Sequence, residues 1–195
     1  FNKGILPVAV ATAMFGAGVA SAADFYLTSD ATISDLPSKN ATTDYIVNNN
    51  STLSTNSSMT VYYGTIDGVA LINDSSRGGT VTIGGNLTMH GNIGATNATG
   101  NFTISEWNSL TLASNVSTFN SDNMTLSDNT VLNFGNVTSG YNRGSSETLT
   151  FASNITMGSN STINVGNGTT LNGNIYGAGT LNVLGNFTST GSIGA

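Results

Sequence analysis

The chain has 195 residues, no cysteine, 7% charged residues and a formal net charge of −6. The lack of cysteine excludes disulfides and thiolate metal sites, and an acidic chain without basic clusters disfavours nucleic acid and anionic membranes as partners. Lys plus Arg number 4 and Asp plus Glu number 10, whereas 24 residues are glycine and Asn, Thr and Ser are abundant. This composition favours an all-β protein over a helical one, and the shortage of charge and proline disfavours the alternative of a disordered chain.

Residues 1–22 have the layout of a secretory signal peptide. Lys3 precedes an apolar run from Ile5 to Val19, and small residues follow at the cleavage positions Ala20, Ala22 and Ala23. The apolar run is shorter than the ~20 residues that a membrane-spanning helix needs. We therefore expect cleavage after residue 22, with a membrane anchor or an N-terminal filament helix as the alternatives. Because the first residue is not methionine, we also expect that further residues precede it.

Residues 23–79 are less regular than the residues that follow them. Short apolar stretches, such as those at 45–47 and 61–63, alternate with long polar ones. An array of stacked repeats needs an atypical unit that covers its first edge. We therefore predict that residues 23–79 form an N-terminal cap with one or two irregular coils, and that Gly78 and Gly79 are a hinge into the regular region.

Residues 80–195 repeat a short phrase: apolar–polar–apolar, a small pair that ends in Asn, then apolar–Thr. The phrase occurs as VTIGGNLT at 81–88 and as LNVLGNFT at 181–188, and residues 109–137 align with residues 148–176 without a gap. Apolar residues two positions apart share one side of a strand. Strands this short cannot bury an apolar side alone, but stacking each turn of the chain on the previous one buries it. The repeats therefore predict a parallel β-helix (β-solenoid) with about twenty residues, three short strands and three corners per coil.

The gapless alignment makes specific predictions about the interior. It matches Leu110 with Leu149, so both side chains should point into one core, two coils apart. Outward positions of the strands are predicted at Thr111, Thr150 and Thr156. Asn tolerates the backbone of tight corners, and the predicted corner residues of the repeat are Asn86, Asn115, Asn154 and Asn186. The side chains predicted to be buried are Leu112, Val116, Leu126, Phe151, Ile155, Ile163, Val165, Leu171 and Val183.

The repeat phrase runs on to Ala195 without a polar terminal unit. We therefore expect that the natural chain continues beyond this residue. A last coil with nothing stacked on it should expose Val183, Phe187 and Ile193, and should be a surface for self-association. At Val183 two expectations conflict, because the repeat phrase places the same side chain inside.

Groups that could carry chemistry are few. His90 is the single histidine and is predicted to be a solvent-facing corner residue. Asp67 and Asp74 flank an apolar stretch, and Asp122 and Asp128 share one repeat, but the aligned copy of that repeat has no acid at either position. Hydrolysis by carboxylates needs two acids at a fixed separation, and this spacing gives no reason to expect one. We predict no catalytic, cofactor-binding or metal-binding residues and no enzymatic activity.

Asn-x-Ser/Thr triplets are frequent in the repeats. In a secreted eukaryotic or archaeal protein each Asn could carry a glycan. The alternative, which we favour, is that a corner Asn, an inward apolar residue and an outward Thr are what the coil itself requires. The triplets include those at Asn86, Asn97, Asn101, Asn115, Asn123, Asn136, Asn154, Asn160, Asn167 and Asn186.

The signal-peptide layout, the lack of cysteine and the Gly/Asn/Thr-rich repeats at 80–195, such as TTLNGNIYGAGTL at 169–181, resemble the passenger region of bacterial autotransporter adhesins. The resemblance implies a right-handed parallel β-helix that is secreted and displayed at the outer membrane, where it adheres to a protein or glycan of a host or neighbouring cell. That family has a C-terminal translocator barrel, which is not among these 195 residues. The alternatives are a subunit of a glycosylated extracellular filament and a polysaccharide-cleaving β-helix enzyme.

Overall fold

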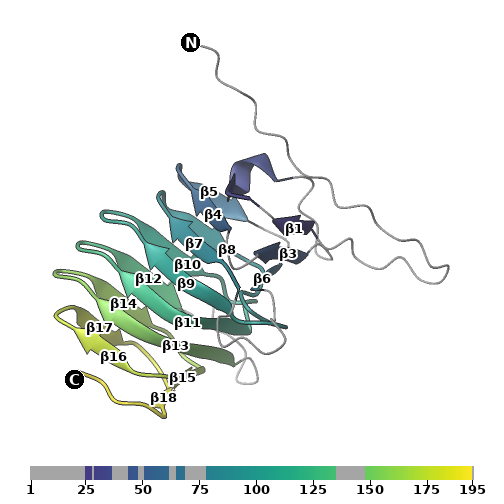
Figure 1. Cartoon of the computed structure of the whole chain (residues 1–195). Coiled ribbons are helices and arrows are strands. Elements are labelled where there is room, and N and C mark those ends of the chain that lie inside the picture. Colours follow the sequence, from purple (N-terminus) through teal and green to yellow (C-terminus); the bar gives the residue numbers. More distant parts are fainter. Residues whose placement is uncertain are drawn as a thin grey trace, which may run out of the picture.

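The computed structural model describes residues 25–27, 29–36, 44–47, 51–61, 65–68, 78–134 and 148–194. Over these residues the chain consists of strands stacked along one axis in chain order, with a single 3-10 turn, η1 (Ile33–Asp35) (Figure 1). Each pairing between the described strands is parallel, which confirms the predicted parallel β-helix.

The strands form three faces, since a full coil contributes one strand to each. The first face contains β1 (Phe25–Leu27), β3 (Asp44–Val47), β6 (Thr65–Gly68), the first parts of β11 (Thr118–Leu126) and β13 (Leu149–Met157), β15 (Thr169–Asn172) and β18 (Phe187–Ser189). The second face contains β2 (Ala31–Thr32), β4 (Thr52–Thr55), β7 (Thr80–Ile83), β9 (Thr99–Ile104), the second parts of β11 and β13, and β16 (Ile175–Gly177). The third face contains β5 (Met59–Val61), β8 (Leu87–Met89), β10 (Ser109–Leu112), β12 (Val131–Phe134), β14 (Thr162–Val165) and β17 (Thr180–Val183).

Coil length varies around the predicted value. Ile163 pairs with Leu181, 18 residues later, and Ile155 pairs with Ile175, 20 residues later. The coil that contains the connection from β12 to β13 is longer, because Phe119 pairs with Phe151, 32 residues later. Three strands per coil and about twenty residues in the shorter coils therefore agree with the prediction.

The bends between faces depend on small and polar residues. β11 turns from the first face to the second with one residue more than β13, and the buried hydroxyls of Ser121 and Ser153 lie 2.9 Å apart there. This hydrogen bond satisfies polar groups that the bend turns inward. Gly94 lies at a corner with a φ of 64°, where a Cβ atom would overlap the carbonyl of Asn120. Glycine is required at this position because the adjacent coil approaches so closely.

The spatial register differs from the gapless sequence alignment: Leu110 and Leu149 point into one core as predicted, but the predicted register between their strands is wrong. Leu110 and Leu149 are both fully buried, but Leu110 lies on the third face and Leu149 on the first. The register partner of Leu132 is Ile163, not the Leu171 that the alignment matches with it. The alignment moved each strand to the next face, because strands on all three faces carry the same apolar–polar–apolar phrase.

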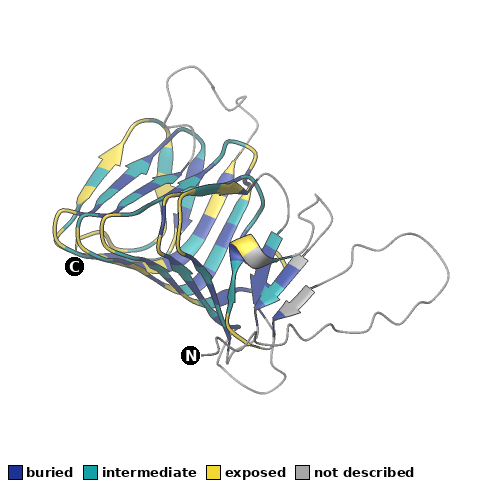
Figure 2. Ribbon diagram, turned by 90° about the horizontal axis from the view of Figure 1, so that it is seen from above, coloured by how far each residue is buried: buried dark blue, intermediate teal, exposed yellow. Residues whose placement is uncertain are grey.

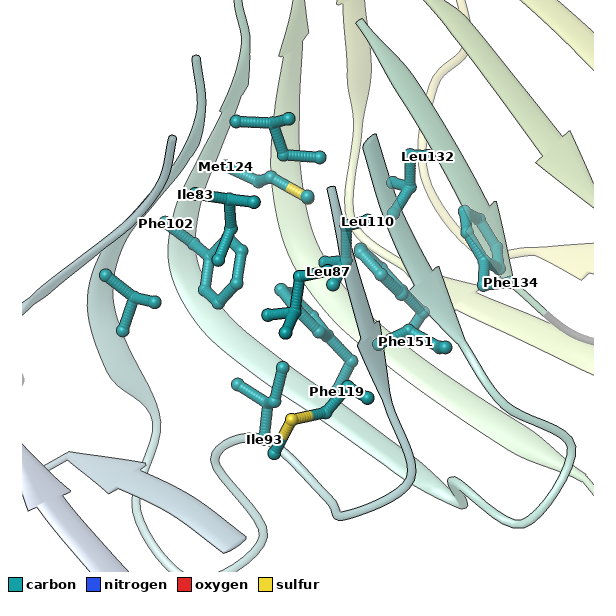
Figure 3. Packing of buried hydrophobic residues seen from close by; sticks show 14 of the residues in the cluster. Ile83, Leu87, Ile93, Phe102, Leu110, Phe119, Met124, Leu132, Phe134 and Phe151 are labelled. Atoms are coloured by element: carbon teal, nitrogen blue, oxygen red, sulfur yellow. The ribbon is translucent and has the colours of Figure 1, made fainter. Parts of the chain in front are cut away.

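The apolar side chains fill one continuous core between the three faces (Figure 3). Figure 2 shows buried positions on strands of the stacked coils. Along β13 buried residues alternate with outward ones, as expected for strands with one apolar side. Four phenylalanine rings stack through successive coils: Phe119 and Phe151 lie face to face at 4.2 Å, Phe134 stacks on Phe151 at 4.7 Å, and Phe102 meets Phe119 edge-on at 5.1 Å. Stacking adds about 0.5–1.5 kcal/mol per pair to the free energy of burial.

Eight of the nine side chains predicted to be buried are buried, with exposed fractions of 0% or 1%. Val183 is 49% exposed, so its predicted burial is wrong. Its strand, β17, ends its sheet, and no further strand of the described chain lies beyond it. Thr150 and Thr156 are exposed as predicted, whereas Thr111 is half-buried and its hydroxyl accepts a hydrogen bond from Asn133 on the adjacent strand.

Tyr45 predicts a pH dependence of stability. It is 2% exposed, and burial raises the pKa of its phenol. As pH rises, the phenol of the unfolded chain, with a pKa of about 10, loses its proton before the buried phenol of the folded chain does. The contribution of the protonated Tyr45 to stability is therefore complete below pH ~10 and is lost as pH rises through the higher pKa of the folded state. Urea unfolding as a function of pH should therefore show stability falling above pH ~10, and Tyr45→Phe should reduce that fall. Tyr176→Phe, a change at an exposed side chain, is the control, and an unchanged fall in Tyr45→Phe would contradict the assignment.

Candidate functional site

Two rows of polar side chains run along the outside of the second face. The Thr row consists of Thr82, Thr103, Thr125 and Thr156, which are register partners in successive coils. The Asn row consists of Asn101, Asn123 and Asn154, two residues earlier on the same strands. The repeat is about 4.8 Å along each row, and the rows are about 6.6 Å apart along the strands.

The polar groups of these rows are available to an external ligand. Within the described part of the chain, the four hydroxyls of the Thr row and the side-chain amides of Asn101 and Asn123 make no hydrogen bond. Asn154 is paired, since its Oδ1 atom accepts from the backbone and the side chain of Asn174 at 3.2 and 3.1 Å. The second face therefore presents a regular, uncharged array of hydroxyl and amide groups.

The third face differs, because its outer amides are paired with one another. Asn182 donates to Asn164 at 2.9 Å, Asn164 donates to Asn133 at 2.8 Å, and Asn133 donates to Thr111 at 3.1 Å. Such a ladder stabilises the stack and leaves each amide with fewer free hydrogen-bonding positions. Of these two faces, the second is accordingly the better candidate for a binding surface.

The Asn row also bears on the Asn-x-Ser/Thr triplets. Three of them, at Asn101, Asn123 and Asn154, place the Asn and the Thr on the outside and a fully buried apolar residue between them. Neighbouring Asn residues in one row are about 4.8 Å apart, which is too close for a bulky glycan on each. This geometry favours the explanation that the triplets are a requirement of the coil.

The corner between the second and third faces has the same construction in three successive coils. The αL position of this corner is occupied by Trp107, Asn129 and Asn160, with φ of 65°, 58° and 56°. In each coil the next residue donates a hydrogen bond to the carbonyl three positions back: Asn108 to Ser105, Thr130 to Ser127, and Ser161 to Gly158. We call these residues the αL corner.

The side chains of the αL corner form a chain of contacts along the stack. Asn160 donates to Asn129 at 3.3 Å, and Asn129 donates to the carboxylate of Glu106 at 3.4 Å. Trp107 has the most exposed large apolar side chain of the described residues, at 73%. Asn adopts positive φ readily, whereas for a bulky residue this backbone costs about 1–3 kcal/mol.

Each predicted corner Asn lies at a connection or a bend. Asn86, Asn115 and Asn186 lie between strands, and Asn154 lies at the bend inside β13. Asn115 donates to the backbone carbonyl of His90 at 2.6 Å, and its Oδ1 atom lies 3.2 Å from the Nδ1 atom of this histidine. His90 is half-buried at the corner after β8. The backbone N–H of Asn186 donates to Asn167 at 3.0 Å, so these residues tie neighbouring coils together.

Of the described acidic residues, Asp67 and Asp128 accept hydrogen bonds from the backbone, while Glu106 and Asp128 occupy equivalent positions of the αL corner in successive coils. Asp67 is buried, and its carboxylate accepts a hydrogen bond from the backbone N–H of Thr96 at 3.1 Å. Asp128 accepts from the backbone N–H of Ser159 at 2.8 Å, and Asp122 lies at the bend of β11. No group of three or more His, Cys, Asp or Glu side chains that could hold a metal ion occurs among the described residues. Asp74, like the cleavage residues Ala20, Ala22 and Ala23, lies outside the described residues.

Comparisons with protein-family models, with curated proteins and with solved structures found no match. Within the described ranges, no helix has the length and the apolar character needed to cross a bilayer. The fold thus defines the class of protein as a parallel β-solenoid, and the outer surface is the basis for a functional proposal.

The αL corner was not predicted from the sequence, although a signal is present. The segments SEWN at 105–108, SDNT at 127–130 and GSNS at 158–161 each precede a third-face strand by the same spacing. Aligning these segments would have matched Trp107 with Asn129 and Asn160.

Proposed function

We propose that this chain is a structural and adhesive stalk of the autotransporter-passenger type, secreted and displayed at the outer cell surface. The observation that carries the proposal is the pair of Asn and Thr rows, which repeat in register along a stack of coils and in which the four Thr hydroxyls and the amides of Asn101 and Asn123 are unpaired. Strands pack these side chains in fixed positions, so a partner surface meets many weak hydrogen-bonding groups at once. Repeated weak contacts on one scaffold yield strong overall attachment through effective concentration.

The composition of the outer surface supports a neutral partner. The rows carry no charge, and the chain as a whole has a net charge of −6. Anionic surfaces are therefore disfavoured, and neutral glycans or polar protein surfaces of a host or neighbouring cell fit better. Val183, Leu184 and Ile193 are 49%, 60% and 46% exposed in the last described coils, which is consistent with self-association through this end.

Attachment of beads coated with the purified chain to panels of bacterial and animal cells tests the proposal. Coated beads should attach to at least one cell type well above uncoated beads. The triple variant Thr103→Ala, Thr125→Ala, Thr156→Ala, which strips hydroxyls from one row, should reduce attachment at least tenfold. The matched control is Thr60→Ala, Thr88→Ala, Thr111→Ala, which changes three register partners on the third face and should leave attachment unchanged. No attachment to any cell type, or equal losses in both triple variants, would contradict an adhesive second face.

Intact-mass measurement on the protein recovered from its producing cells distinguishes a secreted passenger from a glycosylated filament subunit. Loss of residues 1–22 without added mass is expected for a secreted passenger. Retention of these residues together with hexose-sized increments would instead favour the glycosylated filament.

A further inference from the structure

We infer that the αL corner around Trp107 is a binding site for a neutral saccharide. This inference rests on the proposed adhesive function and names the ligand class and the position of one site. Trp107 takes a left-handed conformation that bulky residues rarely adopt, at a position where the next two coils have Asn. Strained residues with this geometry concentrate at functional sites.

Packing does not explain the tryptophan. Its side chain is 73% exposed, so it fills no space in the core. The corner closes in the same way in all three coils through the residue that follows, which is Asn108, Thr130 or Ser161. The corner therefore does not need an indole ring at this position, and Asn would satisfy the backbone better.

The surroundings of the ring indicate what it binds. The αL corner also holds the carboxylate of Glu106, the residue before Trp107, and the amides of Asn129 and Asn160 at the equivalent positions of the next two coils, and these three side chains are joined by hydrogen bonds at 3.4 and 3.3 Å. The remaining exposed large apolar side chains of the described residues lie on or after β16, so no apolar patch surrounds Trp107. An aromatic ring bordered by a carboxylate and amides matches a sugar, which has an apolar ring face and hydroxyls around its edge.

Charge restricts the class of sugar. Glu106 and Asp128 are exposed acids within this corner, and the chain has a net charge of −6. Sulfated or carboxylated saccharides would be repelled by these groups. Neutral oligosaccharides are therefore the expected ligands.

Trp107 provides its own probe, because it is the only tryptophan of the chain. Its fluorescence should be that of an exposed indole. Titration with cellotetraose, tetra-N-acetylchitotetraose, maltotetraose and mannotetraose should shift the emission to shorter wavelength in a saturable way with at least one of them. A heparin tetrasaccharide should cause no shift. If none of the four neutral sugars binds at millimolar concentration, or if only heparin binds, the inference is overturned.

Variants separate a binding role from a structural one. Trp107→Asn copies the corner of the next two coils, so its thermal midpoint should equal or exceed that of the natural chain, while saturation-transfer NMR should show at least a tenfold loss of binding to the same sugar. Glu106→Gln and Asn129→Ala should weaken binding severalfold. Leu184→Asn removes another exposed apolar side chain and should leave binding unchanged. Unaltered binding in Trp107→Asn would show that the ring is not a binding residue, and a lower thermal midpoint together with unaltered binding would assign the ring a structural role.

Failure of the saccharide site and failure of the adhesive function give different results. If the natural chain and Trp107→Asn coat beads that attach to cells equally well, and no sugar affects Trp107, this inference fails and the adhesive second face stands. If sugar binds at Trp107 but coated beads attach to no cell, the adhesive proposal fails instead.

Discussion

Replacing Ile155 with aspartate should abolish cooperative unfolding of the coils around β13. Ile155 is 0% exposed and lies between the register partners Met124 and Ile175 on the second face. The substitution removes an apolar side chain, which alone costs about 2–5 kcal/mol, and buries a carboxylate that has no partner. Typical domain stability is only about 5–15 kcal/mol, so the loss is comparable with the whole. Circular dichroism during thermal unfolding should show a broad, early transition in place of a sharp one.

The control for this substitution is Thr150→Asp in the same strand. Thr150 is exposed on the first face, so the new carboxylate remains in water. Its thermal midpoint should stay within a few degrees of that of the natural chain. A comparable fall of the thermal midpoint in both variants would contradict the assignment of Ile155 to the inside and Thr150 to the outside of β13.

The second large effect is expected at Phe151. Its ring stacks on two others, at 4.2 Å from Phe119 and 4.7 Å from Phe134. Phe151→Ala should lower the free energy of unfolding by about 3–5 kcal/mol, because it opens a cavity in the middle of the stack. Urea unfolding monitored by circular dichroism measures this loss, and amide exchange should accelerate in β11, β13 and β15 together.

Phe187 provides a matched control, since it is a half-buried phenylalanine of the last described coil. Phe187→Ala should cost clearly less than Phe151→Ala. A double-mutant cycle with Phe119→Ala should in addition give a coupling energy of about 0.5–1.5 kcal/mol. Equal losses at the two phenylalanines, or no coupling, would show that the ring stack does not stabilise the fold.

The sequence was sufficient to predict the fold class, since the in–out alternation in residues such as Leu149, Phe151 and Ile155 depends only on the period of two in a strand. It was also sufficient for most of the interior. Burial of Val165 and Leu171 follows from the same alternation and needs no knowledge of their neighbours. The prediction of burial was wrong at Val183, because burial of this side chain requires a further strand stacked on β17.

The register between coils could not be predicted in the same way. Leu110 and Leu149 sit in equivalent phrases on different faces, and identical phrases carry no information about which face they occupy. The candidate sites depend on that register. Asn101 and Asn123 become a row, and Trp107 becomes the partner of Asn129, only after the coils are stacked correctly.

Engineered disulfides test the register most directly, because the chain contains no cysteine of its own. Thr125 and Thr156 are register partners on the outside of the second face. Neighbouring strands are about 4.8 Å apart, which is within the Cα separation of about 4.4–6.8 Å that a disulfide spans. The double variant Thr125→Cys, Thr156→Cys should therefore oxidise rapidly and completely within the monomer, as measured by intact mass after thiol alkylation.

The comparison pair is Thr111→Cys, Thr150→Cys, which the gapless sequence alignment matches but which lies on the third and first faces. We predict that this pair keeps its free thiols under the same conditions. Rapid oxidation of the Thr111–Thr150 pair, with free thiols in the Thr125–Thr156 pair, would contradict the three-faced solenoid and both surface sites that depend on it.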